Sequence, residues 1–236
     1  MDQTIVIDRR FNGPRLSGNG GYVAGLLAQH VDPRGAVEVT LRAGVPLDTP
    51  LRLRRGDDGS YALTDGGQLV CEARAATLDL QPPELQPWMI NAPVAPDAGS
   101  DTDSDFHWCF VCGRGRAVGD GLRVFGQRVA GKPMSLAPYR AHQAHAEADG
   151  RISPAHLWGA LDCPGAWAAQ DADDTRPSLT GRMTGQVLHR PAAGKDCLVV
   201  GWRIGAEGRK LYAGTALYTR AGTLCAVALT TWIVLA

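Results

Sequence analysis

One internal repeat restricts the fold of this chain more than any other feature of its sequence. Residues 67–73 read GQLVCEA and lead to TLDL at 77–80, while residues 222–228 read GTLCAVA and lead to TWIVL at 231–235. In both segments a glycine supplies turn geometry, and the apolar run that follows it fits a pleated strand. A sequence that repeats itself in this way predicts two copies of one structural unit.

Each half of the chain is predicted to contain one helix followed by a meander of strands. The first helix is expected at 20–30, and the second at 154–170 with Ser153 as N-cap and Pro154 at the first helical position. The strands are expected at 37–43, 51–55, 61–64 and 69–80, and again at 183–189, 197–204, 210–219 and 223–235. One helix covered by one antiparallel sheet in each half is an α+β arrangement.

A segment with the composition of a linker separates the two halves. Residues 81–105 contain five prolines and then the run DAGSDTDSD. Such a composition disfavours both helices and strands. We therefore expect an N-terminal domain at 1–81, a Pro/Asp-rich linker at 82–105 and a C-terminal domain at 106–236.

The charge balance and the hydropathy pattern exclude several classes of partner. The 236-residue chain carries 24 basic and 24 acidic side chains, so it offers no basic field for nucleic acid or an anionic membrane. Its start, MDQTIVID, lacks the features of a signal peptide, and no apolar run reaches the ~18 residues of a membrane span. We interpret the six scattered cysteines as reduced thiols of a cytoplasmic protein.

Cys109 and Cys112 form the only Cys-x-x-Cys pair. A structural zinc site has four ligands, commonly including a second such pair. His142 and His145 could complete a set, although their spacing follows no standard pattern. We therefore expect neither a metal nor a cofactor, and we interpret the pair as small buried apolar residues. These histidines and His156 are expected on the surface or in loops.

The start of the first predicted helix can stabilise negative charge that develops on a bound ligand. Asn19, Gly20 and Gly21 stand where a helix leaves its N–H groups unpaired and its dipole positive. Such donors stabilise the oxygen of a carbonyl under attack. Asp162, in the second helix, is a candidate base or nucleophile whose pKa burial would raise. The alternatives are a surface carboxylate, and a helix that kinks or ends at Pro164.

Three segments resemble hotdog-fold acyl-CoA thioesterases. Residues 19–28, NGGYVAGLLA, are similar to the central helix of that superfamily, which begins with His-Gly-Gly. Residues 107–113 (HWCFVCG) and 119–125 (GDGLRVF) resemble the start of the phenylacetyl-CoA-type members, and Leu161-Asp162 resembles the middle of their helix. The resemblance covers nearly the whole chain outside the linker. It implies two tandem hotdog domains, each a central helix wrapped by a curved antiparallel sheet, that form a pseudo-dimer.

The resemblance also implies how one site is shared between the halves. In the family one subunit gives the glycine-led helix start, and the other gives an acid nine residues beyond its own histidine. Here the first half has Gly20 and Gly21 but Ala28 at the acid position, while the second half has Asp162 but begins Ser153-Pro154-Ala155. One complete site would thus combine Asn19, Gly20 and Gly21 with Asp162. Thr180, where the resembling proteins often carry a hydroxyl, is expected to orient water or the aspartate.

The activity that this resemblance implies is hydrolysis of an acyl-CoA or a related acyl thioester. The CoA phosphates would meet basic side chains, for which Arg114, Arg116 and Arg190 are candidates. Two alternatives remain open: a hotdog hydratase or dehydratase, and a non-catalytic acyl-CoA-binding protein. One chain supplies both halves of the site, and two such chains could also pair as a homodimer.

Overall fold

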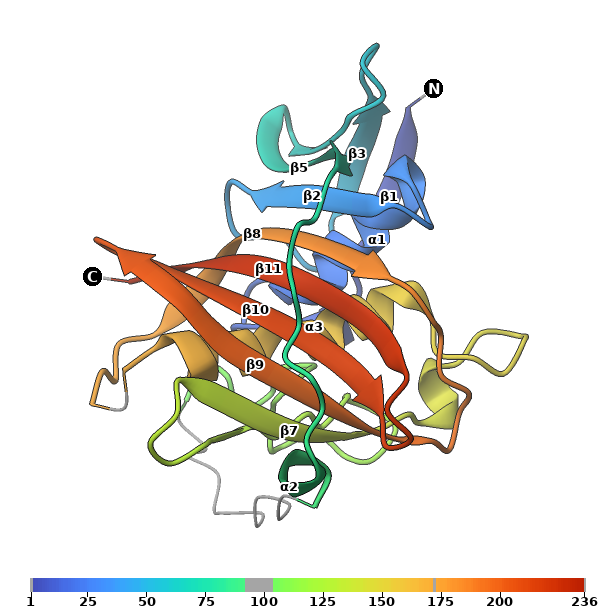
Figure 1. Ribbon diagram of the computed structural model, residues 1–236. Coiled ribbons are helices and arrows are strands. Elements are labelled where there is room, and N and C mark those ends of the chain that lie inside the picture. Colours follow the sequence, from blue (N-terminus) through green and yellow to red (C-terminus); the bar gives the residue numbers. More distant parts are fainter. Residues whose placement is uncertain (1, 92–103, 172, 236) are drawn as a thin grey trace.

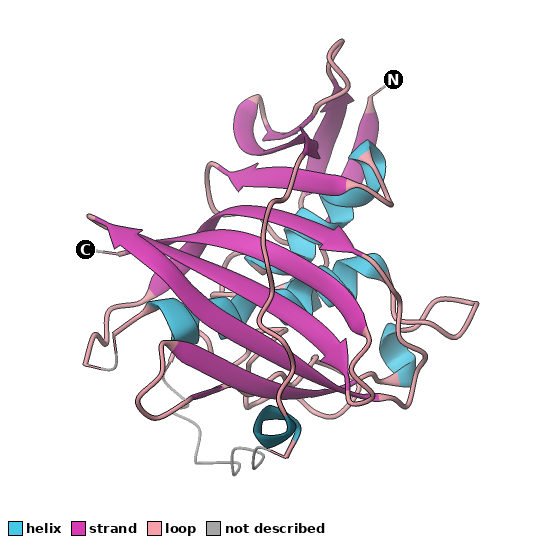
Figure 2. Cartoon of the chain, viewed as in Figure 1, coloured by secondary structure: helices cyan, strands magenta, loops and turns pink. Residues whose placement is uncertain are grey.

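The protein is built around one large antiparallel sheet with two long helices on one of its faces (Figures 1 and 2). The structure, a computed structural model, describes residues 2–91, 104–171 and 173–235. The strands run in the order β1-β3-β4-β5-β2-β8-β11-β10-β9-β7-β6, and neighbouring strands pair antiparallel throughout.

The first part of the sheet and the first helix come from the N-terminal half of the chain. The strands are β1 (Gln3–Val6), β2 (Ala36–Leu41), β3 (Pro50–Arg55), β4 (Tyr61–Asp65) and β5 (Gln68–Ala76), and the helix is α1 (Gly20–Val31). A 3₁₀ turn at Arg9–Phe11 lies between β1 and α1.

The remaining strands come from the C-terminal half and surround the second long helix. They are β6 (Gln127–Arg128), β7 (Met134–Arg140), β8 (Ser178–Val187), β9 (Asp196–Glu207), β10 (Lys210–Thr219) and β11 (Leu224–Val234), and the helix is α3 (Pro154–Ala169). A second 3₁₀ turn lies at Gln143–His145.

The two parts of the sheet mirror each other about a central seam. On one side of the seam the order is β2, β5, β4, β3, and on the other it is β8, β11, β10, β9. At the seam, β2 pairs with β8 from Val37 opposite Gly185 to Thr40 opposite Arg182. These four strands therefore each have a counterpart at the same distance from the seam, as expected from the repeat between 67–80 and 222–235.

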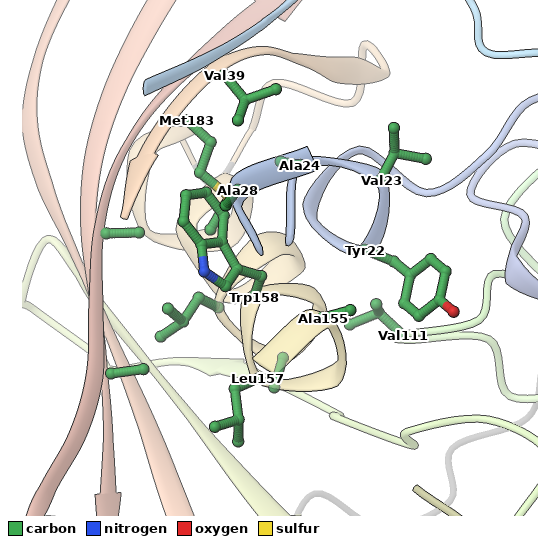
Figure 3. Packing of buried hydrophobic residues seen from close by; sticks show 14 of the residues in the cluster. Tyr22, Val23, Ala24, Ala28, Val39, Val111, Ala155, Leu157, Trp158 and Met183 are labelled. Atoms are coloured by element: carbon green, nitrogen blue, oxygen red, sulfur yellow. The ribbon is translucent and has the colours of Figure 1, made fainter. Parts of the chain in front are cut away.

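The helices α1 and α3 pack against each other between this sheet and the loops beneath it (Figure 3). Small residues permit the close approach: a Cβ at Gly25 would lie 2.6 Å from the Trp158 Cβ, and one at Gly185 would lie 3.0 Å from the Trp158 ring. Trp158 is thus held between α1 and β8. Its neighbours in the main hydrophobic core include Ala28 and Met183. This core fixes the position of each helix start relative to the middle of the other helix.

The opposite face of the sheet is crossed by the chain that connects the two halves (Figure 1). A short helix, α2 (Pro87–Ile90), lies within the segment expected to be a linker, and Met89 packs with Leu136 and Val200. The Tyr218 hydroxyl donates a hydrogen bond of 2.9 Å to the Pro83 carbonyl. Residues 83–90 of this segment therefore lie along the sheet, while two of its prolines and most of its acidic run lie outside the described residues.

The predicted elements agree with the structure, apart from their ends. Both helices lie where the sequence placed them, and α3 continues through Pro164 to Ala169 instead of ending at the proline. The strand expected at 69–80 ends at Ala76. Strand β1 and the pair β6–β7 add to the predicted meanders. Among the described residues, no helix is long and apolar enough to cross a membrane.

Candidate active site

The first turn of α1 is shaped by Asn19 and the two glycines that follow it. Asn19 has an extended backbone, and its side-chain oxygen accepts a 2.9 Å hydrogen bond from the Tyr22 N–H, which is the usual N-cap arrangement. The Asn19 N–H donates to the Phe11 carbonyl at 2.8 Å, so the entering chain is anchored as well. The helix start is therefore rigid, and its remaining N–H groups are set in place.

Asp162 lies in the middle of α3 and faces the start of α1. It is only 2% exposed. Its Oδ2 accepts hydrogen bonds from the Asn19 side-chain amide at 2.9 Å and from the Gly21 N–H at 3.1 Å. A Cβ at Gly21 would lie 2.6 Å from the Asp162 Cβ, so only glycine allows this approach. The structure thus brings together the aspartate of one half and the glycine-led helix start of the other, as the sequence predicted.

Thr180, on β8, completes the surroundings of the carboxylate. Its hydroxyl donates a 2.7 Å hydrogen bond to the Asp162 Oδ1. Thr180 also lies against the helix start, because a Cβ at Gly20 would be 2.6 Å from its Cβ. All five residues expected from the sequence to form a site, Asn19, Gly20, Gly21, Asp162 and Thr180, therefore meet at one point.

The pKa of Asp162 reflects opposing influences. Burial raises it from the ordinary range to about 6, since water no longer solvates the charged form. Hydrogen bonds from Thr180, Gly21 and Asn19 favour the charged form and act in the opposite direction. Asp162 is thus a buried carboxyl group that retains donors able to hold its negative charge.

The N–H groups of Gly20 and Gly21 differ in whether a protein acceptor occupies them. The Gly21 N–H is taken by Asp162, so it cannot also hold a substrate carbonyl in this arrangement. The Gly20 N–H has no acceptor among the residues that the structure describes. An N–H at the first helical position points out of the helix end. Of the two donors expected from the sequence, Gly20 is therefore the one available to a ligand.

A pocket of about 250 Å³ opens at this point. Its walls come from both halves of the chain and include Asn19, Gly20, Asp162, Cys163, Thr180 and Trp232. The N-terminal half also contributes the segment 41–44 that follows β2. The lining is mostly apolar, and its polar groups include those of Asn19, Asp162 and Thr180 at the helix start. Of these walls, the sequence did not indicate Trp232 or the segment after β2, because their approach depends on how the two halves pair.

The start of α3 occupies the mirrored position but has different chemistry. Ser153 makes no side-chain hydrogen bond to the helix backbone, and its hydroxyl instead contacts the His156 ring. Pro154 has no N–H to donate. Ala28, at the position equivalent to Asp162, is buried in the apolar core. This helix start therefore has neither the donor nor the carboxylate of the first one.

Three thiols gather beside Asp162. The sulfur atoms of Cys109, Cys112 and Cys163 all lie within 4.8 Å of one another. The Asn19 side-chain amide also approaches the Cys109 sulfur, at 3.8 Å. The sequence showed Cys109 and Cys112 as a pair, noted that His142 and His145 could complete a set, and led us to expect no metal. The residue that joins them is Cys163, and its position directly after the candidate catalytic Asp162 was the signal that could have identified it.

Several polar residues considered from the sequence have structural partners. Arg116 is buried and binds the Trp108 carbonyl, Asp120 and the Asn12 side chain. Arg190 forms ion pairs with Glu147 and Asp149. Both arginines therefore already have partners within the protein. Arg114 lies over the Phe125 ring.

The expectation that His142, His145 and His156 lie on the surface or in loops is wrong for His156, which belongs to α3. His145 lies in a 3₁₀ turn but is buried. It is 2% exposed and stacks on His156, with 4.9 Å between the ring centroids. Burial lowers the pKa of His145 to about 4 and that of His156 to about 3. Both rings pack against Phe110, so the fold uses them as neutral aromatic residues near the start of α3.

Comparison with known proteins shows the fold. No protein-family model and no curated protein matches the sequence. Among solved structures, a putative thioesterase from Novosphingobium aromaticivorans is 15% identical, covers 100% of this chain and 96% of its own, and has a TM-score of 0.62. A hot dog fold protein of unknown function from Alicyclobacillus acidocaldarius is 13% identical, with 100% and 92% covered and a TM-score of 0.62.

A third similar structure is an acyl-CoA thioesterase II from Mycobacterium marinum. It is 16% identical, covers 92% of this chain and 90% of its own, and has a TM-score of 0.60. At these identities the likeness establishes the architecture and not the activity. This chain has the hotdog fold, and the resemblance seen in its sequence is confirmed at that level.

Proposed function

We propose that this protein hydrolyses an acyl-CoA, or a related acyl thioester, to a free acid and a thiol. One observation carries the proposal: a buried carboxylate from one half lies against the glycine-led helix start of the other, at a pocket lined by both halves. The names of the similar structures from Novosphingobium aromaticivorans and Mycobacterium marinum add support for a thioester as the substrate class.

The proposal includes two tandem hotdog domains in one chain. Their boundaries are 1–81 and 106–236, joined by 82–105. The mirrored strand order about the β2–β8 seam, with one long helix in each half, supports this division. In such a pseudo-dimer the site needs no second chain, because both of its parts belong to the same molecule.

The first chemical role in the proposal belongs to Gly20. When water attacks a thioester carbonyl, negative charge develops on the carbonyl oxygen. The Gly20 N–H, at the positive end of α1 and without a protein acceptor among the described residues, would donate to that oxygen. A fixed donor of this kind lowers the barrier by about 3 kcal/mol.

The second role belongs to Asp162, as the base. Its Oδ1 accepts from Thr180 and has capacity for one further donor, such as an attacking water. As the water oxygen bonds to the acyl carbon, its proton passes to Asp162, and the carbon–sulfur bond then breaks. The proton finally leaves with the thiol. Asn19 and Thr180 position the carboxylate, since each donates to one of its oxygens.

A hydratase or dehydratase receives less support from the geometry. Such hotdog enzymes pair an aspartate with a histidine, and Asp162 has hydrogen bonds to Asn19, Gly21 and Thr180 instead. Among the described residues, no histidine donates to its carboxylate. Thioester hydrolysis is therefore the function we retain.

The test is release of free thiol from a series of acyl-CoAs by the purified protein and by Asp162→Asn. This isosteric variant keeps the shape of the side chain but removes the base, so kcat/KM is expected to fall by about 10³-fold. Asp196→Asn serves as the matched control, because Asp196 is an exposed aspartate paired with Arg140 on the surface. Equal rates for wild type and Asp162→Asn would contradict the mechanism. If the protein binds acyl-CoAs but hydrolyses none of them at any chain length, the proposal that it is a thioesterase is wrong.

A further inference from the structure

We propose that Cys109, Cys112 and Cys163 bind one thiophilic metal ion of the zinc class, with its fourth coordination position open to the pocket at Asp162. The three residues come from two separate segments, a loop before β6 and the helix α3. Folding alone brings them together. The inference concerns metal binding and does not depend on the proposed hydrolysis.

The separations between the sulfur atoms fit a single ion. In a tetrahedral site with zinc–sulfur bonds of about 2.3 Å, neighbouring sulfurs lie about 3.8 Å apart. Here all three sulfurs lie within 4.8 Å of one another. The sulfurs are thus at most about 1 Å further apart than in a bound site, a difference that side-chain rotation can close.

The backbone that follows Cys109 makes a tight turn that ends at Gly113. The Gly113 N–H donates to the Cys109 carbonyl at 2.8 Å, and a Cβ at Gly113 would lie 2.4 Å from that oxygen. Only glycine fits there. The Asn19 side-chain amide approaches the Cys109 sulfur at 3.8 Å. A sulfur that receives an N–H donor is suited to carry negative charge, as a metal-bound thiolate does.

The ligand set determines which ions fit. Thiolates are soft ligands that favour zinc and other thiophilic ions over magnesium or calcium. Among the described residues, no histidine, cysteine, aspartate or glutamate offers a fourth atom to this group. Cys109 and Cys163 also line the pocket. A site with three protein ligands and access to a pocket leaves one position for an exchangeable ligand, such as water or a small thiol.

Binding would couple the loop to the helix. The metal replaces the protons of those thiols that are not already ionised, so uptake of the ion releases protons to the solvent. It also joins Cys109 and Cys112 to Cys163, the neighbour of Asp162 in α3. The expected consequence is a more stable chain with metal than without it, whatever its activity.

The test uses the full-length protein, reduced and freed of metal with a chelator, and then titrated with Co²⁺ under anaerobic conditions. We expect saturation at one equivalent per chain, with thiolate-to-cobalt charge-transfer absorption and the visible bands of tetrahedral cobalt. Added Zn²⁺ should displace the cobalt and raise the midpoint of thermal unfolding. Elemental analysis of protein purified without chelators should find about one zinc per chain.

Cys163→Ser is expected to abolish the charge-transfer absorption of one thiolate and to weaken cobalt binding by at least about 10²-fold. Cys225→Ser is the matched control, since Cys225 is a buried free cysteine outside the cluster. Should either variant fold poorly, the wild-type protein can be titrated with cobalt before and after alkylation of its cysteines. Alkylation of the cluster thiols should abolish cobalt binding. The proposal is overturned if reduced wild type takes up neither ion, or if Cys163→Ser and Cys225→Ser bind cobalt equally well. A Cys109–Cys112 disulfide in the purified protein, with no metal uptake after reduction, would also overturn it.

Discussion

The starts of α1 and α3 are equivalent by position in the mirrored fold, yet they have opposite chemistry. At the start of α1 a buried carboxylate receives three hydrogen bonds, from Asn19, Gly21 and Thr180. At the start of α3, Pro154 stands at the position equivalent to Gly20 and has no N–H, and a buried alanine, Ala28, stands at the position equivalent to Asp162. In the proposed pseudo-dimer, one half would supply the donors and the other half would supply the acid, so a single site would combine complementary parts of both.

The physical basis of this asymmetry is the cost of burying charge. A carboxylate in an apolar interior is tolerated only when donors replace the water that it loses. Asp162 has such donors, because Gly21 lets α1 approach closely and Thr180 lies on the adjacent strand. The mirrored point has apolar contacts, with Ala28 close to Trp158 (Figure 3). An acid buried at the position of Ala28 would therefore lack the donors that stabilise Asp162.

The largest effect is expected when a carboxylate is placed at the mirrored position. Ala28→Asp would bury an acid without the three donors available to Asp162, and should lower the free energy of unfolding by about 3 kcal/mol relative to Ala28→Asn at pH 8. Ala28→Asn is the matched control for size. The folded state would raise the pKa of this new carboxyl, so the difference should shrink as the pH falls and the group is protonated. Urea denaturation at pH 8 and pH 5 measures this difference in the free energy of unfolding. Equal stability of the two variants at pH 8 would show that the two positions do not differ in their ability to hold a buried charge.

The second prediction compares the effect on catalysis of one substitution at the start of each helix. In Gly20→Ala the new Cβ would lie 2.6 Å from the Thr180 Cβ and 2.7 Å from its hydroxyl oxygen, so Thr180 must shift and the pocket must narrow. We expect kcat/KM for thioester hydrolysis to fall by about 10²-fold. Pro154→Ala makes a change at the equivalent position of α3 and should leave the rate unchanged. Similar losses in both variants would mean that the two helix starts are not functionally distinct.

The smallest effect concerns the hydroxyl that holds Asp162. Thr180→Val keeps the volume of the side chain and removes the donor to the Asp162 Oδ1. The expected result is a fall in kcat of about tenfold with little change in KM, because the lost hydrogen bond orients the base. Thr180→Ser retains the hydroxyl and should restore most of the rate. If Thr180→Val and Thr180→Ser behave alike, the hydroxyl does not position the base.

Sequence periodicity was sufficient to predict the elements that repeat in the chain. Both long helices and most strands depend on local patterns, such as the proline after Ser153 and the glycine before each final strand. The resemblance to hotdog thioesterases implied that Asp162 pairs with the start of α1, because Ala28 and Pro154 depart from the family pattern, and the structure brings these groups together. The repeated elements could be predicted because each depends on residue types at fixed spacings, whereas the pairing came from the resemblance.

The remaining features depend on how distant segments meet. That the Gly21 N–H is used by Asp162 itself follows from the close packing of α1 on α3, which no spacing reveals. The approach of Cys163 to Cys109 has the same origin. His145 is polar by residue type, but the fold buries it against the ring of His156. In each case tertiary packing, and not local sequence, determines the partner.

The most direct test of this account is a crystal structure of the protein with a non-hydrolysable acyl-CoA analogue, in which the thioester is replaced by a ketone that keeps the carbonyl. We predict that the carbonyl oxygen lies within hydrogen-bonding distance of the Gly20 N–H, with the carboxylate of Asp162 on the other side of the carbonyl carbon. An analogue bound at the start of α3, or bound away from both groups, would contradict the division of one site between the two halves.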